Sequence, residues 1–196
     1  MFDALFTTTT EYQKLSHALS GKGACALFGL PASGRAQVYA ALCRQLDKPL
    51  CIVTPGEAEA TRFAADLNTL GIPAAVFPAR DYVLRPIEGT AREYEYRRLA
   101  VLGELVGGRL RAVAVPAEAL TQFTTPKEDF CANTRTLHAG DTLLRDDLLA
   151  ALFGAGYTRR AQVDGPGQFS VRGDIVDIFA PDQKMPVRME FWGDEI

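Results

Sequence analysis

Short apolar runs alternate with amphipathic segments over the first two-thirds of the chain. This alternation is typical of strand–helix–strand units, which place parallel strands in one sheet and helices on its faces. The apolar runs predict strands at residues 24–28, 50–53, 74–77 and 112–115. The segments between them predict helices at about 34–46 and 57–70, and one that ends at Gly107-Gly108. The sequence therefore predicts an α/β domain with a parallel sheet flanked by helices.

The pattern changes after Thr125-Pro126. One amphipathic helix around Leu148 and Phe153 is followed by short apolar runs at 169–172, 174–179 and 187–192. Short strands that follow one another through turns pair antiparallel. The sequence therefore predicts two domains, an α/β domain over residues 1–126 and a small α+β domain with antiparallel strands over residues 127–196.

Two predicted helices begin with the same short motif. Thr8-x-x-Glu11 and Thr90-x-x-Glu93 have the spacing of a capping box, in which both side chains accept hydrogen bonds from backbone N–H groups of the first turn. The first motif predicts a short helix that carries Leu15 and Leu19 on its apolar face.

Charge and hydropathy exclude two classes of function. The 196 residues include 21 Lys and Arg against 24 Asp and Glu, which gives a formal net charge of −3. This balance excludes a surface that binds nucleic acid over its whole extent. No apolar run approaches the roughly 18 residues that a membrane span needs, so no membrane partner is expected.

The chain's cysteines and histidines are scattered along it: Cys25, Cys43, Cys51, Cys131, His17 and His138. A metal site would need several such ligands at short spacing, so we expect neither a metal nor another cofactor. Cys25 and Cys51 lie in apolar runs and are predicted to be buried. Unpaired thiols in a chain without a secretion signal indicate the cytoplasm.

The segment from Gly29 to Ala36 stands where a phosphate-binding loop, G-x-x-x-x-G-K-[ST], would stand, between a predicted strand and a predicted helix. Gly29 and Gly34 occupy the two glycine positions, but Arg35 replaces the Lys that contacts phosphate, and Ala36 replaces the hydroxyl that binds Mg²⁺. Without the metal, the negative charge that develops on the phosphates in the transition state loses its main stabilisation. The loop is predicted to be degenerate and the chain to hold no catalytic residue; weak anion binding and a purely structural turn are the two readings left.

The last predicted strands place unusual residues on one face. Side chains alternate across a strand, so Arg188 and Trp192 share the polar face while Met189 and Phe191 point to the core. Arg172 is on the polar face of an earlier strand, and pairing would gather Arg172, Arg188 and Trp192 in one exposed patch. Arg and Trp are enriched at interface hot spots. The alternative is a Trp that covers its own sheet edge with an Arg stacked on it.

Two stretches around these strands carry a family resemblance: GQFSVRGDIVDIF at 167–179 and PVRMEFWGDEI at 186–196. They resemble the signature shared by UvrB and the bacterial transcription-repair coupling factors (Mfd). Weaker similarity extends over nearly the whole chain, including the phosphate-loop region and residues 113–120. The resemblance to UvrB would imply an intact phosphate loop and a long aromatic hairpin. Arg35-Ala36 and the short stretch from Arg80 to Thr90 depart from both, which favours the UvrB-like, degenerate RecA-like module of a coupling factor.

The resemblance implies a protein-interaction module that recruits UvrA to stalled RNA polymerase in nucleotide excision repair. It carries the UvrA contact positions onto Arg172, Arg188 and Trp192, the last an aromatic position where Phe is usual. It also implies that RNA polymerase, DNA and an ATP-dependent translocase motor concern other parts of the parent protein, and that the 1–126 domain lacks its closing segment. Two alternatives remain: a nucleotide-dependent DNA-remodelling ATPase and a UvrB-like binder of damaged DNA.

Overall fold

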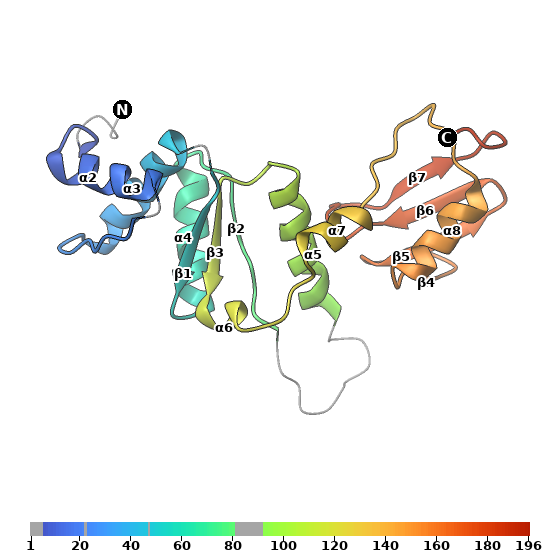
Figure 1. The fold of residues 1–196 in the computed structure, drawn as a ribbon. Helices are drawn as coiled ribbons and strands as arrows, with labels where there is room; N and C mark the ends of the chain where they lie inside the picture. The colour runs from blue at the N-terminus through green and yellow to red at the C-terminus, as the bar shows by residue number, and fades with distance from the viewer. Residues whose placement is uncertain (1–5, 22, 47, 81–91) are drawn as a thin grey trace. The chain divides into compact units, whose positions relative to one another are not determined.

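The computed structural model describes residues 6–21, 23–46, 48–80 and 92–196. Thr90, with its predicted capping motif, and nearly all of the 80–90 stretch lie outside the described residues. The described residues fall into two compact units, one of residues up to 80 with 104–122 and one of residues 92–103 with 123–196 (Figure 1). The domain boundary at residue 126 stays a prediction.

The first unit contains a three-stranded parallel sheet in the order β1-β3-β2. Its strands are β1 (Leu50–Thr54), β2 (Ala74–Val76) and β3 (Ala112–Pro116). In the middle strand, Ala112 pairs with Leu50 on one side and Ala74 on the other. Every residue of β3 is buried, as an uninterrupted apolar run predicts for a central parallel strand.

This sheet contacts the helices α3 (Ala32–Gln45), α4 (Glu57–Thr69) and the short α6 (Ala117–Leu120). Helix α2 (Thr10–Ser20) packs on α3. Helix α4 lies against all three strands (Figure 1). Its buried side chains recur at helical spacing: Ala60, Phe63, Ala64 and Leu67. They share one core with Ile52 of β1 and Ala114 of β3. The predicted parallel sheet flanked by helices is confirmed.

Two predictions for the first unit are wrong. Residues 24–28 are exposed and form no strand; Phe28 is 86% exposed. The run consists largely of small side chains, which bury little apolar area, and none of the described strands pairs with it. Cys25 and Cys51 are exposed, whereas Cys43 of α3 is buried.

Helix α2 begins one residue later than its predicted cap. The hydroxyl of Thr9, not Thr8, accepts a hydrogen bond from the backbone N–H of Tyr12 at 3.3 Å. The buried residues of α2 are Tyr12 and Ser16, and Tyr12 packs with Leu42 of α3 while Leu15 is half-buried beside them. Leu19, predicted on the apolar face, is 37% exposed.

The second unit contains a four-stranded sheet in the order β4-β5-β6-β7. Its strands are β4 (Thr158–Arg159), β5 (Gln168–Arg172), β6 (Ile175–Phe179) and β7 (Val187–Glu190). Strands β5, β6 and β7 pair antiparallel, as predicted, while β4 runs parallel to β5. The helices are α7 (Lys127–Ala132), α8 (Arg145–Gly154) and residues 92–103 of α5 (Arg92–Val106). The sequence patterns predicted neither α7 nor β4.

One face of the second sheet forms the core of this unit. Leu148 and Leu152 of α8 pack with Phe169, Val176 and Phe191, of which Phe169 and Val176 have no exposed surface. Phe191, which follows β7, is in the core as strand alternation predicted. The opposite face of β5, β6 and β7, called the outer face below, carries the polar side chains.

Candidate functional site

The register of the antiparallel strands determines which side chains are neighbours on the outer face. Cross-strand pairing forms two rows of neighbours: Ser170–Asp177–Arg188 and Arg172–Ile175–Glu190. Residues two apart on a strand point to the same side, so both rows share the face that Phe169 and Val176 do not occupy. Within these rows Arg172, Arg188 and Glu190 are exposed, Ile175 and Asp177 are half-buried, and Ser170 is buried.

Arg188 and Asp177 form a two-point ion pair on this surface. Arg188 Nε donates to Asp177 Oδ1 at 2.7 Å and Nη2 donates to Oδ2 at 3.0 Å. The Asp177 side chain is 17% exposed and that of Arg188 is 57% exposed, so the anion is the less exposed member of the pair. Hydrogen bonds from Arg188 lower the pKa of the Asp177 carboxyl below its ordinary value of 3.8, although burial acts in the opposite direction. The pair is therefore charged at neutral pH.

Arg172 and Arg188 stand around an open hollow of about 480 Å³ on the outer face. Its lining residues are Gln162, Val163, Arg172, Asp177, Pro186 and Arg188. Arg172 Nη2 donates to the carbonyl of Ala161 at 2.9 Å, which ties its guanidinium to the segment after β4. The lining carries two guanidinium groups and one carboxylate, so it suits a carboxylate or carbonyl oxygen of a partner.

Trp192 lies in a tight turn that follows β7. The backbone N–H of Trp192 donates to the carbonyl of Glu195 at 2.8 Å, and Gly193 within the turn has a φ of 66°. The preceding residue, Phe191, is 5% exposed in the core, whereas Trp192 is 83% exposed. This exposure contradicts the alternative in which the indole covers its own sheet edge. The strand itself ends at Glu190, two residues earlier than predicted.

The structure brings two of the three predicted contact residues together. Arg172 and Arg188 line the same hollow, and Trp192 is not among the described residues that line it. Sequence reasoning did not identify Asp177, which joins the predicted residues on the outer face. The sequence signal was a carboxylate at a polar position of the middle strand, but only the register shows that it faces Arg188.

The phosphate-loop positions lie largely inside α3. Gly29 has a φ of 81°, but the helix begins before Gly34. The N–H groups of Gly34 and Arg35 both donate to the carbonyl of Pro31, at 2.9 and 3.3 Å. A phosphate cradle needs such N–H groups to converge on the anion. In this arrangement they are engaged within the chain.

The two substituted loop positions differ in their surroundings. Arg35 Nη1 lies 3.8 Å from Oε1 of Glu59 on α4, and this ion pair joins α3 to α4. The Ala36 side chain is buried, at 4% exposed. The cationic position therefore points to a carboxylate of this chain.

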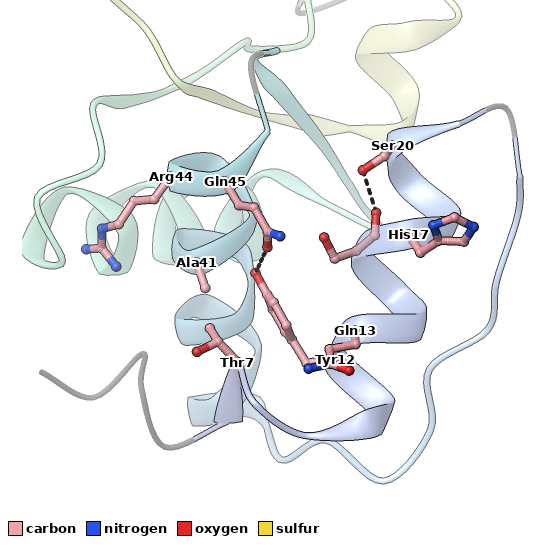
Figure 2. Close-up of a pocket in the computed structure, with 9 residues that line it drawn as sticks. Thr7, Tyr12, Gln13, His17, Ser20, Ala41, Arg44 and Gln45 are labelled. Atoms are coloured by element: carbon pink, nitrogen blue, oxygen red, sulfur yellow. Dashed lines mark hydrogen bonds between the residues drawn. The ribbon is translucent and has the colours of Figure 1, made fainter.

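A second hollow, of about 600 Å³, lies between α2 and α3 (Figure 2). The Tyr12 hydroxyl donates to Gln45 Oε1 at 3.0 Å across it, and the Ser20 hydroxyl donates to the Ser16 carbonyl at 2.8 Å. Arg44 Nη2 donates to the carbonyl of Leu70 at 2.6 Å. These polar groups are satisfied within the first unit, so the hollow does not indicate a particular ligand.

In the described part of the chain, no three His, Cys, Asp or Glu side chains gather as a metal ion would require. None of the helices described combines the length and the apolar character of a membrane crossing.

The second unit matches a known protein family. A family model described as the UvrB interaction domain matches residues 136–196. This range contains α8 and all four strands of the second sheet, and with them Arg172, Asp177, Arg188 and Trp192.

Similarity to characterised proteins extends over most of the chain. The transcription-repair-coupling factor of Mycobacterium tuberculosis is 37% identical over 200 residues, which covers 98% of this chain and 16% of that protein. The one from Bacillus subtilis is 29% identical over 172 residues, 87% of this chain and 15% of that protein. UvrABC system protein B of Chlorobium limicola is 28% identical over 185 residues, 87% of this chain and 27% of that protein. Residues 136–196 thus match the UvrB interaction domain, in a chain similar over most of its length to transcription-repair-coupling factors and, at lower identity, to UvrB.

Proposed function

We propose that this chain is a UvrB-like interaction module of nucleotide excision repair that binds UvrA through Arg172, Arg188 and Trp192. The proposal depends on the side chains that the outer face exposes. Two guanidinium groups stand around an open hollow on it, and an indole that is 83% exposed follows the last strand. The match to the UvrB interaction domain supports a partner of this class.

The three side chains have the physical properties of binding hot spots. A guanidinium group makes two parallel hydrogen bonds to a carboxylate, and an indole brings a large contact area with few torsions to order. Truncation of a residue at such a position costs about 2 kcal/mol or more of binding free energy. All three side chains are accessible without any change in the core beneath them.

A pull-down with purified UvrA tests the assignment. The variant Arg172→Ala/Arg188→Ala/Trp192→Ala is expected to lose retention of UvrA and to keep its far-ultraviolet circular dichroism. The matched control is Arg62→Ala/Phe123→Ala/Lys127→Ala, which removes two exposed cations and one exposed ring elsewhere. Undiminished retention by the first variant would refute the proposal, as would equal loss by the control.

In the whole protein we place this module in a transcription-repair coupling factor, where it would recruit UvrA to a stalled RNA polymerase. Contacts with the polymerase and with DNA, and an ATP-dependent motor, would then belong to other parts of that protein. The chain spans 15 to 16% of the length of the coupling factors cited above, which leaves room for those functions in the relatives. The cysteines are unpaired, which suits the cytoplasm.

We also propose that residues 1–126 form a domain whose sheet is completed by a further segment of the parent protein. Strand β1 is at the sheet edge, and Val53 on it is 54% exposed. Phe28 and Leu27 of the 24–28 run are 86% and 45% exposed. Apolar side chains at an open sheet edge favour a covering strand or helix.

We infer that the degenerate phosphate loop does not bind nucleotide. The backbone N–H groups of Gly34 and Arg35 donate to the Pro31 carbonyl, and the Arg35 guanidinium lies near Glu59. These contacts favour this inference over a DNA-remodelling ATPase. Titration of the chain with a fluorescent ATP analogue and Mg²⁺ is expected to show no saturation. Saturable binding that requires Mg²⁺ would restore the ATPase hypothesis.

A further inference from the structure

Asp177 lies at the centre of the outer face and accepts hydrogen bonds from its neighbours on both adjacent strands. It lies on β6, with Ser170 opposite it on β5 and Arg188 opposite it on β7. The Ser170 hydroxyl, on a residue that is 2% exposed, donates to Asp177 Oδ2 at 3.4 Å. The carboxylate is therefore anchored on the buried side while Arg188 lies on the exposed side.

The ion pair uses only one edge of the guanidinium group. Nε and one N–H of Nη2 donate to Asp177. A guanidinium group has five N–H donors, so both N–H groups of Nη1 and the second of Nη2 are left on its other edge. That other edge can bind a second acceptor while the first is occupied.

We propose that Asp177 is a positioning residue that fixes Arg188 in the orientation in which its outer edge meets UvrA. This inference rests on the function proposed above and assigns no contact with the partner to Asp177 itself. An arginine held in one rotamer before binding loses less conformational freedom when the complex forms. Removal of the Asp177 carboxylate should therefore weaken binding through Arg188 alone.

A double-mutant cycle tests this role by titration against purified UvrA. Asp177→Asn keeps the shape of the side chain and is expected to weaken binding about fivefold. In the Arg188→Ala background the same substitution is expected to change the affinity less than about twofold, because the group it positions is absent. The matched control Asp147→Asn, an exposed carboxylate in the first turn of α8, is expected to leave the affinity unchanged.

A second readout follows the guanidinium directly. The Arg188 Nε–H signal in a nitrogen-correlated NMR spectrum of the chain is expected to be sharp, and to broaden or vanish in Asp177→Asn while the backbone amide spectrum is kept. A purely structural role of Asp177 would instead move many amide signals and reduce affinity equally in both backgrounds of the cycle.

The outcomes separate this inference from the proposed function. If Arg188→Ala weakens UvrA binding and Asp177→Asn does not, or if Asp177→Asn strengthens it, the positioning role is wrong and the proposed function stands. If Arg188→Ala has no effect on UvrA binding, the proposed contact and the positioning role are both wrong. Loss in both Asp177→Asn and Arg188→Ala, without additivity, supports the positioning role.

Discussion

At the scale of single residues, the ionisation of Asp177 makes the stability of the folded chain depend on pH. Its pKa is lower in the folded chain than in the unfolded chain, since Arg188 donates two hydrogen bonds to the carboxylate. A depressed carboxyl pKa stabilises the folded state above the unfolded pKa of about 4, and this stabilisation disappears as the pH falls through the folded value.

Asp177→Asn is therefore expected to lower the free energy of unfolding by about 1 kcal/mol at pH 7, because the exposed Arg188 limits the strength of the pair. The difference between wild type and variant should shrink as the pH is lowered below about 4. Urea unfolding at a series of pH values measures it. A difference that is the same at pH 7 and at acid pH would show that the ion pair is not its source.

Gly167, at the start of the family signature, is required by a close approach of backbone and ring. Its φ is 74°, and a Cβ at this position would overlap the hydroxyl and ring atoms of Tyr96. Gly167→Ala is expected to destabilise the chain by about 3 kcal/mol, from backbone strain and steric overlap together.

The matched control is Gly156→Ala. Gly156 has a similar φ of 82° but no atom within 4 Å of its Cβ position. The Gly156→Ala substitution should therefore lower the free energy of unfolding only by the strain of the left-handed backbone, about 1 kcal/mol. Equal losses for the two variants in urea unfolding would contradict a specific role for the Tyr96 contact.

At the scale of secondary-structure elements, periodicity predicted well those elements that bury one continuous apolar face. Helix α4 and the core face of β5 follow directly from spacing of three to four residues or of two, and strand β3 follows from an uninterrupted apolar run. The predicted strand at 24–28 is wrong, because an apolar composition alone does not provide a neighbouring strand to pair with. Helix α7, with no buried residue, and the two-residue β4 gave no periodic signal to detect.

The 24–28 run provides a test at this scale. Its amide hydrogens are expected to exchange with solvent at nearly unprotected rates, since the run is exposed and pairs with none of the described strands. The amides of β3, which is buried and paired on both sides, are expected to be among the slowest. Hydrogen exchange followed by mass spectrometry measures both. Protection of 24–28 equal to that of β3 would restore the predicted strand.

At the scale of the whole molecule, strand alternation predicted which residues share the polar face, and the resemblance predicted which of them contact a partner. Alternation could not predict the cross-strand register, so the bond between Asp177 and Arg188 and the hollow beside Arg172 emerged only from the structure. Alternation also extended the last strand through Trp192, whereas β7 ends at Glu190 and a turn that contains Gly193 follows. The three contact residues remain a proposal.

The central claim is that the exposed indole enters an interface with UvrA, and the single tryptophan of this chain allows a direct measurement. Fluorotryptophan incorporated at Trp192 gives one fluorine NMR signal, which should respond to the ratio of heavy to light water as an exposed ring does. Saturating UvrA is expected to shift or broaden this signal and to remove the solvent response. A complex that forms while the signal and its solvent response stay unchanged would contradict a role of Trp192 in the interface.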